Sequence, residues 1–340
     1  MTQLPPSFAR SAGLVLSLIA LGACTVDAPE THPTPAPNGT VPVPEVSPSP
    51  PVRSRDSAIP AGAVKMWPES DPSPPVLHSD EWLAPVPMPG PINTAGAEDS
   101  PFITPDGLSF LFFFTPDAQV PAEQQLFDGV TGIYLTQPSD GAWAEPWRLV
   151  LQDPGKLALD GCEFLLGEEL WFCSAREGNI GDIDLWIADL RHGVASSWRN
   201  AGECINRELQ VGEMHLSSDG ATLYFHAPGA AGGVDLFLTR RLQEGWSDPE
   251  PISALNTDAD EGWPFVSEDG SEFWFTRWHE GTPGIFRSLR TEAGWSEPAL
   301  ILSTFAGEPT LDRAGNLYFV HHYVVDGKVV EADIYFVARR

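Results

Sequence analysis

Short runs that alternate bulky and smaller or polar residues recur from residue 98 to the end of the chain, and each run is bounded by a turn. Period-two alternation with many aromatic and β-branched residues predicts half-buried β-strands. The clearest set comprises four such runs, at residues 264–266, 273–276, 285–289 and 297–302. Four short strands with tight turns predict one antiparallel sheet, which needs neighbouring sheets to cover its faces.

The same four-run pattern recurs along the chain with a period of about 45 to 50 residues, which is typical of propeller blades. The fifth set stops after its third run. Residues 82–89 carry the missing Trp-x-x-Pro pattern, which also starts at Trp143, Trp246 and Trp295. The five sets occupy residues 98–151, 160–198, 213–252, 261–302 and 308–338.

These patterns predict an all-β fold. We expect a five-bladed β-propeller of four-stranded antiparallel blades, closed by the N-terminal strand at residues 82–89 pairing with the last blade. Closure of this kind hides the edge strand that an open array would expose.

The first 75 residues differ in composition from the rest. Residues 1–24 combine Arg10, an apolar run and the ending Leu-Gly-Ala-Cys, which predicts a signal peptide too short to span a membrane permanently. Residues 25–75 are rich in Pro, Ser and Thr, which predicts a disordered, extended tether. The propeller domain is expected at residues 76–340.

The segment around Cys24 resembles the bacterial lipobox, in which the cysteine is acylated and becomes the mature N-terminus. The resemblance implies an exported, lipid-anchored protein. Thr25 rather than Asp follows the cysteine. If the cell has two membranes, the resemblance therefore also implies that the protein is retained at the outer membrane, on its periplasmic side or at the cell surface. The alternative is an ordinary signal peptide with a chance cysteine.

Three motifs in the repeats resemble the TolB-like, WD40-like β-propeller repeats: residues 101–107 (PFITPDG), 216–225 (LSSDGATLYF) and 333–336 (DIYF). The linkers at residues 91–94 and 255–257 match the segment between blades in that family. The resemblance covers about residues 82–340. It implies a propeller that binds a ligand or serves as a scaffold for another protein, and it implies no particular activity.

The chain carries 47 Asp and Glu against 19 Lys and Arg, a formal net charge of −28. Such a field repels phosphate backbones, so we expect no nucleic-acid partner and no membrane contact beyond the lipid anchor. We expect a monomer.

Acidic residues begin the innermost predicted strand of each blade. They are Glu98, Asp99, Asp160, Glu163, Glu213, Asp260, Glu261 and Glu308. A ring of carboxylates at one channel mouth allows three roles: hydrogen bonds that hold neighbouring blades, a cation such as calcium in the central channel, or the acid pair of a glycoside hydrolase. The structural role is favoured. For hydrolysis the candidates are Asp99, Asp160, Glu213 and Glu261.

Polar and aromatic residues from the loops are expected on the same face. They are Arg176, His226, Arg277, Trp278, His279 and His322. This mixture suits a saccharide or a peptide of a partner protein. We assign the repeated tryptophans to the packing between blades. The pair His321-His322 has no spaced partner in sequence, and we expect a strand-end feature rather than a metal site.

Three cysteines follow Cys24. Cys162 and Cys173 flank a turn at equal distances, so a disulfide between them is possible in an oxidising compartment, although a bond directly across two strands is strained. Cys204 competes for either partner, and the odd count leaves one thiol over. The chain has no Cys-x-x-Cys, phosphate-binding glycine loop or Gly-x-Ser-x-Gly motif.

Together these features favour a lipid-anchored propeller that binds a ligand or partner protein through an acidic top face and is not an enzyme. The alternative is a five-bladed glycoside hydrolase with paired carboxylates at the channel mouth.

Overall fold

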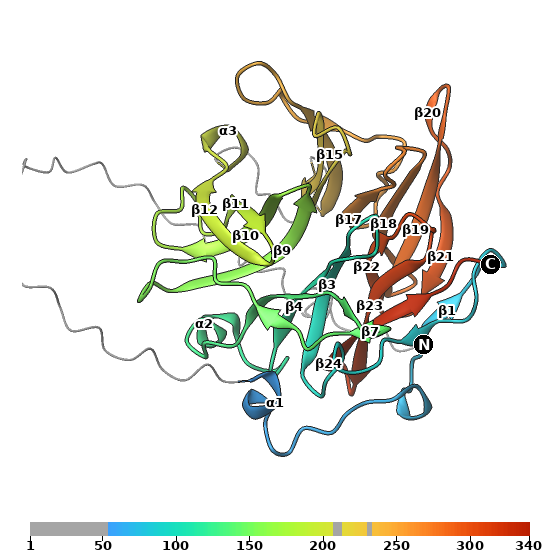
Figure 1. Ribbon diagram of the computed structural model, residues 1–340. Coiled ribbons are helices and arrows are strands. Elements are labelled where there is room, and N and C mark those ends of the chain that lie inside the picture. The colour runs from blue at the N-terminus through green and yellow to red at the C-terminus, as the bar shows by residue number, and fades with distance from the viewer. Residues whose placement is uncertain (1–53, 207–212, 230–232) are drawn as a thin grey trace, which may run out of the picture.

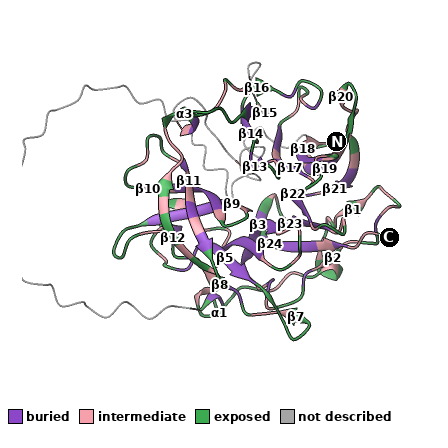
Figure 2. Ribbon diagram, turned by 45° about the horizontal axis from the view of Figure 1, so that its top comes forward, coloured by how far each residue is buried: buried purple, intermediate pink, exposed green. Residues whose placement is uncertain are grey.

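The computed structural model describes residues 54–206, 213–229 and 233–340. The described chain is almost entirely β-structure, with sets of antiparallel strands arranged around a common centre (Figures 1 and 2). The described α-helices are single turns: α1 (Arg55–Ala58), α2 (Ala122–Gln125) and α3 (Glu203–Asn206). No helix among the described residues is long and apolar enough to cross a membrane. The expected all-β, propeller-like fold is confirmed.

The first and second strand sets follow the predicted order. The first contains β3 (Ala97–Ile103), β4 (Phe110–Thr115), β5 (Gly132–Thr136) and β8 (Trp147–Arg148), and a small hairpin, β6 (Pro138–Ser139) and β7 (Ala142–Trp143), lies between β5 and β8. The second contains β9 (Ala158–Leu166), β10 (Glu169–Arg176), β11 (Asp184–Arg191) and β12 (Val194–Asn200). The fourth strand of this set, β12, pairs with β11 with one register shift.

The remaining sets are as follows. The third contains β13 (Met214–Leu216), β14 (Thr222–Pro228), β15 (Val234–Arg240) and β16 (Glu250–Pro251). The fourth contains β17 (Glu261–Val266), β18 (Glu272–His279), β19 (Thr282–Thr291), β20 (Gly294–Trp295) and β21 (Ala299–Ser303), and β1 (Val76–Leu77) pairs with β21. The fifth contains β22 (Ala306–Leu311), β23 (Leu317–Val325) and β24 (Lys328–Val337), and β2 (Val86–Pro87) pairs with β24.

The fifth and first sets are hydrogen-bonded to each other. A single parallel bridge between Ala97 and Ala332 joins β3 to β24, so the two predicted blades form one continuous sheet. Farther along the same edge of β24, which is the edge opposite β23, Val86 pairs with Phe336, and Trp82 forms a bridge with Arg339. The chain segment at residues 82–89 therefore lies beside the last strand of the chain, where the Trp-x-x-Pro pattern predicted it.

The turn between the first two strands of a set explains the repeated Asp-Gly motif. Asp106 accepts hydrogen bonds from the hydroxyl of Thr104 (2.7 Å) and the backbone N–H of Leu108 (3.0 Å). Gly107 then adopts a φ of +71°, a left-handed conformation that a residue with a Cβ adopts only at a cost. The short side chain and the glycine together reverse the strand in the space of a few residues.

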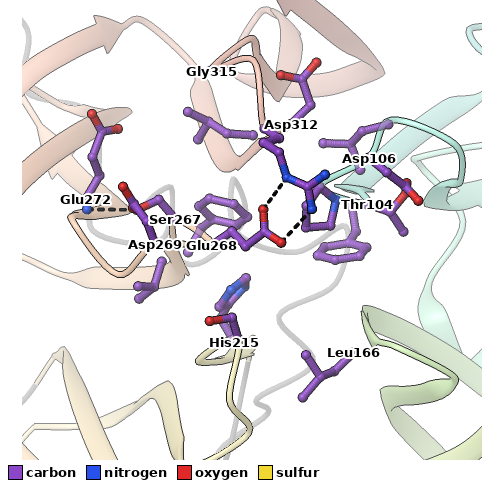
Figure 3. Close-up of a pocket in the computed structure, with 18 of the residues that line it drawn as sticks. Thr104, Asp106, Leu166, His215, Ser267, Glu268, Asp269, Glu272, Asp312 and Gly315 are labelled. Atoms are coloured by element: carbon purple, nitrogen blue, oxygen red, sulfur yellow. Dashed lines mark hydrogen bonds and ion pairs between the residues drawn. The ribbon is translucent and has the colours of Figure 1, made fainter.

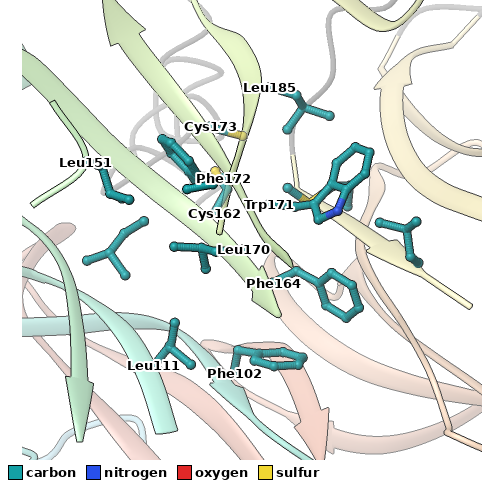
Figure 4. Packing of buried hydrophobic residues seen from close by; sticks show 14 of the residues in the cluster. Phe102, Leu111, Leu151, Cys162, Phe164, Leu170, Trp171, Phe172, Cys173 and Leu185 are labelled. Atoms are coloured by element: carbon teal, nitrogen blue, oxygen red, sulfur yellow. The ribbon is translucent and has the colours of Figure 1, made fainter. Parts of the chain in front are cut away.

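The largest group of buried apolar residues lies between the first, second and third sets. Phe102, Leu111, Phe164, Leu170 and Trp171 all belong to it, and each is at least 95% buried (Figure 4). Leu170 and Trp171 are adjacent in β10 and therefore point to opposite faces of the sheet, so both faces of the second set are covered by neighbouring apolar residues.

Residues 54–77 form a segment that we call the N-terminal strap. Arg55 is 4% exposed and contacts Glu98, while Lys65 pairs with Glu331 and Asp333. Asp71 contacts the imidazole of His321 at 2.7 Å. The tether predicted over residues 25–75 is therefore corrected, because packed chain begins by residue 54; residues 25–53 lie outside the described residues. Composition did not reveal the strap because isolated residues attach it: the charged Arg55, Lys65 and Asp71, and the apolar Met66 and Leu77, which pack against the core.

The disulfide expected between Cys162 and Cys173 is not formed, and both residues are buried thiols. A β-bulge shifts the register between β9 and β10, so Cys173 lies opposite Gly161 instead of Cys162. The hydrogen bond with Cys173 and burial raise the pKa of the Cys162 thiol well above its usual value. Cys204 is exposed, and its Sγ lies 3.7 Å from the backbone oxygen of Trp246.

Candidate functional site

The innermost strands share a bulge that turns side chains into the central channel. In β3, β9, β17 and β22 the pairing with the next strand shifts by one residue. The first residue of each bulge has a positive φ: Ser100 (+47°), Cys162 (+56°), Trp263 (+52°) and Glu308 (+57°). These residues are not glycines, so each bulge stores local backbone strain.

Four rings meet across the channel, three of them two residues after a bulge and the fourth on β13. We call Phe102, Phe164, His215 and Phe265 the aromatic layer. Ring centroids are 5.0 Å apart for Phe102 and Phe164, 4.4 Å for Phe164 and His215, and 4.6 Å for His215 and Phe265. All four residues line two different cavities, one on each side. The aromatic layer therefore divides the channel into two compartments.

The first compartment holds the carboxylate cluster, which we define as Asp99, Glu163, Glu213 and Glu308. The hydroxyl of Ser100 donates to Glu213 (3.2 Å), and its backbone N–H donates to Asp99 (3.0 Å). The cavity beside the cluster has a volume of about 30 Å³. That is room for about two water molecules.

Burial dominates the electrostatics of the cluster. It raises the pKa of Glu213 to about 7, and the charge of Asp99 adds to the rise. Burial and the charge of Glu213 raise the pKa of Glu163 well above its usual value, and burial with the charge of Asp99 does the same for Glu308. Both carboxyl oxygens of Glu163 are buried without a hydrogen-bond partner. Burial therefore favours the neutral, protonated form of Glu163 and Glu308.

Sequence patterns identified this cluster in part. Asp99, Glu213, Glu308 and His322 were expected to lie together, and His322 Nε2 lies 3.5 Å from Asp99. Glu163 was recognised as an inner-strand acid but was not placed among the binding residues. The position of Glu163 corresponds to Pro101, Pro264 and Pro309 in other sets. An acidic residue where the other sets have proline is the sequence feature that could have identified Glu163 as a channel residue.

The other predicted acids belong to a different arrangement. Glu261 accepts from Arg277 Nε (2.7 Å), and Arg277 Nη2 also donates to the backbone oxygen of Leu255 (2.6 Å). The guanidinium lies 4.7 Å from the centre of the Phe286 ring. We call this arrangement an arginine clamp, because it ties an inner-strand acid to the linker that precedes the strand.

Asp160 and Glu98 take part in equivalent clamps. Arg176 donates to Asp160 (2.6 Å) and to the backbone oxygen of Leu151 (2.8 Å). Glu98 accepts a hydrogen bond from the guanidinium of Arg55, which lies in the N-terminal strap. Arg55 also donates to the backbone oxygen of Ile92 (2.9 Å). Glu98, Asp160 and Glu261 thus hold linkers in place through arginine side chains, whereas the role favoured from sequence was hydrogen bonding between neighbouring blades. Arg176 and Arg277, which were expected to face a ligand, form two of these clamps.

The remaining loop residues do not converge. Nδ1 of His226 accepts from the backbone N–H of Trp263 (3.2 Å), and burial lowers the pKa of His226 to about 4. Trp278 is partly exposed at the end of β18, and the ring of His279 packs 5.7 Å from that of Phe286. Among the described residues, no hydrogen bond or ring contact joins His226, Trp278 and His279 to one another.

The second compartment is a cavity of about 590 Å³, which we call the basin. It lies on the other side of the aromatic layer and opens among the turns that join the first and second strands of the sets (Figure 3). Glu268 and Arg313 form a bidentate ion pair at its mouth, with distances of 2.6 and 2.7 Å. Sequence reasoning missed the basin because its lining comes from turns whose residues look like ordinary strand connections.

The donors of the carboxylate cluster are the oxygen ligands that calcium prefers. Among the described residues, however, no group of three or more His, Cys, Asp or Glu has a metal-holding geometry. The sequence predicted no cofactor and left calcium in the central channel as one of three roles for the acids, and the structure does not test that role. Calorimetric titration of calcium into chelator-treated protein checks it.

No family model matches the chain, and no curated protein matches it. Among solved structures, it is similar to a thermostable family-43 glycoside hydrolase, with 13% identity over 74% of this chain and 92% of that one and a TM-score of 0.49. It is also similar to a putative TolB from Agrobacterium tumefaciens, with 14% identity over 67% of this chain and 70% of that one and a TM-score of 0.43. A third similar structure is the catalytic domain of the GH62 α-L-arabinofuranosidase of Coprinopsis cinerea, with 11% identity over 76% of this chain and 96% of that one and a TM-score of 0.47. Similarity at this level does not decide the function.

Proposed function

We propose that this chain is an exported, lipid-anchored, five-bladed β-propeller that binds a partner protein or another ligand in the basin. Five strand sets, each beginning with an inner strand at the channel, support the blade count. The pairing of β2 with β24 and of Trp82 with Arg339 supports closure by the N-terminal segment.

The anchor is proposed from the resemblance of the segment around Cys24 to a lipobox, and it lies outside the described residues. Acylation at Cys24 places the propeller at the outer membrane of a cell with two membranes. Metabolic labelling with a palmitate analogue tests this proposal: the wild-type chain takes up the label and the Cys24→Ser variant does not. Equal labelling of both chains contradicts it.

The size difference between the two compartments supports binding in the basin. Ligand pockets in proteins typically have volumes of about 300 to 1,000 Å³. The basin, at about 590 Å³, lies in that range, whereas the cavity beside the carboxylate cluster, at about 30 Å³, does not. The turn mouth of the channel is therefore the better binding surface, although sequence patterns favoured the acidic mouth.

A photo-crosslinking amino acid placed at Ser218 tests the binding function. Ser218 is exposed and lines the basin, whereas Ala221 is exposed in the same turn region but does not line it. In the native membrane, we expect a discrete crosslinked adduct from position 218 and none from position 221. Adducts of equal yield from both positions, or from neither, contradict binding in the basin.

Glycoside hydrolysis is the second candidate, because Ser100 links two carboxyls of the expected set. Asp99 and Glu213 both bind Ser100, and a pKa of about 7 suits Glu213 as a general acid. The other two candidates, Asp160 and Glu261, are engaged in arginine clamps. A screen for reducing-sugar release separates the candidates: activity that disappears in Glu213→Gln supports hydrolysis, and its absence from wild type and variant alike supports binding.

A further inference from the structure

We infer that the basin takes a segment of a partner protein in which an apolar or aromatic side chain is flanked by lysine or arginine. This inference rests on the proposed binding function and adds the chemistry of the partner. It follows from the floor of the basin, from the charges at its mouth and from their distribution around it.

The floor of the basin is apolar. The aromatic layer forms it, and Leu311 and Val266 line the cavity with it. His215, the one ring in the layer that can carry a charge, is 7% exposed, and burial lowers its pKa to about 3. The floor therefore presents neutral rings at physiological pH, which favours an apolar or aromatic group over a charged one.

The mouth of the basin is acidic. Five carboxylates and two guanidiniums line the cavity: Asp106, Glu268, Asp269, Glu272 and Asp312 against Arg313 and Arg339. Both guanidiniums already have an acidic partner. Arg313 binds Glu268, and Arg339 donates to Glu81 at 2.6 Å. The lining therefore has an excess of negative charge.

Two of the mouth carboxylates are held in the ionised form by their turns. Hydrogen bonds from Thr104 and Leu108 keep the pKa of Asp106 below its usual value. Hydrogen bonds from Ser267 and Ser271 do the same for Asp269. These donors are neutral, so they do not cancel the negative charge that an approaching ligand meets.

The carboxylates are spread around the mouth instead of being gathered at one point. Asp106 comes from the turn of the first strand set, Asp269 from the fourth and Asp312 from the fifth. Because the carboxylates come from different turns, a peptide with two basic side chains can pair with more than one of them. The net charge of −28 also attracts a basic partner and repels an acidic one over long range.

Three short peptides test this inference on the full chain in detergent micelles: acetyl-Lys-Phe-Lys-amide, acetyl-Glu-Phe-Glu-amide and acetyl-Lys-Gly-Lys-amide. Binding is measured by broadening of the peptide NMR signals. We expect the first peptide to bind at least tenfold more tightly than either of the others. Ser218→Trp, which fills the mouth, removes that binding, while Ala221→Trp retains it and accounts for any binding to the micelle.

Two variants of the exposed ion pair change the charge of the mouth in opposite directions without touching the core. Glu268→Gln removes a negative charge and releases Arg313, so the Lys-Phe-Lys peptide binds several-fold more weakly. Arg313→Gln removes a positive charge, so the same peptide binds several-fold more tightly. Higher salt weakens binding in both variants and in wild type.

Preferred binding of the Glu-Phe-Glu peptide overturns the inference about the partner but leaves binding in the basin intact. Absence of binding by all three peptides also overturns it. The crosslinking experiment at Ser218 decides the proposed function separately, because it needs no assumption about the chemistry of the ligand.

Discussion

At the scale of single residues, the bulged inner strands determine which side chains face the channel. Ser100, Cys162, Trp263 and Glu308 adopt a positive φ, and the residues after them are turned inward. In the second strand set this places Glu163 in the channel with both carboxyl oxygens unpaired. A strained backbone and a buried carboxyl both reduce stability, and their concentration at the channel is typical of functional sites.

The raised pKa of Glu213 predicts a specific pH dependence. The folded protein retains a proton on Glu213 up to about pH 7, whereas the unfolded chain releases it near pH 4.5. This proton therefore contributes stability at pH 4.5 that is lost as the pH rises to about 7. Glu213→Gln has no such loss, so its free energy of unfolding relative to wild type should increase by roughly 1 to 3 kcal/mol between pH 5 and pH 8.

Urea denaturation of both chains at pH 5 and pH 8 measures this effect. The exposed Glu244, changed to Gln, is the matched control and should show the same pH dependence as wild type. A constant difference between Glu213→Gln and wild type across this range excludes a raised pKa at Glu213.

At the scale of elements, the arginine clamps attach linkers to inner strands. In Arg277→Ala the carboxylate of Glu261, which is fully buried, loses its guanidinium partner. Breaking a buried pair in this way costs about 3 to 5 kcal/mol of unfolding free energy. Chemical denaturation measures the cost, and Arg240→Ala, which removes the exposed pair with Glu250, should lose no more than about 1 kcal/mol. Equal losses in the two variants contradict the clamp.

The N-terminal strap supplies the arginine that the first strand set lacks. Arg55→Ala removes that contact, so the strap should detach more often while the propeller stays folded. We expect trypsin to cut after Lys65 several-fold faster in this variant than in wild type. Circular dichroism provides the control, because an unchanged β-sheet spectrum separates local detachment from global unfolding. An unchanged rate of cleavage at Lys65 refutes a role for Arg55 in holding the strap.

At the scale of the whole molecule, the proposed closure depends on Trp82. Its side chain is fully buried, packs edge-on against Trp274 with centroids 5.5 Å apart, and donates to the backbone oxygen of Gly315 (3.0 Å). Trp82→Ala should cost about 3 to 5 kcal/mol. Trp67→Ala, at a residue that is 56% exposed, should change stability by less than about 1 kcal/mol.

Thermal and urea denaturation of the two tryptophan variants compare these losses. A loss below about 1 kcal/mol for Trp82→Ala would falsify the proposal that residues 82–89 close the propeller. Removing a fully buried tryptophan from a contact that holds the fold together should lower the free energy of unfolding by more than that.

The strand sets were predictable because local patterns specify them. Alternation identified strands such as β14 and β23, and the Asp-Gly turns identified where β4 and β18 begin. Residues 82–89 were assigned beside the last strand from a four-residue pattern. In contrast, the roles of the acids were not predictable, because Glu98 and Glu163 are both inner-strand acids and one lies in a clamp while the other faces the channel.

The amino-acid sequence alone determined the all-β repeat, the order of its strands and the place of the N-terminal segment, because these depend on periodicity and turn chemistry within a few residues. Only the tertiary structure decided which carboxylates meet, that Arg55 completes a distant clamp, and that the aromatic layer separates a small acidic compartment from the basin. Those features depend on a one-residue bulge in four of the inner strands (β3, β9, β17 and β22) and on pairing between residues far apart in the chain, and neither leaves a periodic signal in the sequence.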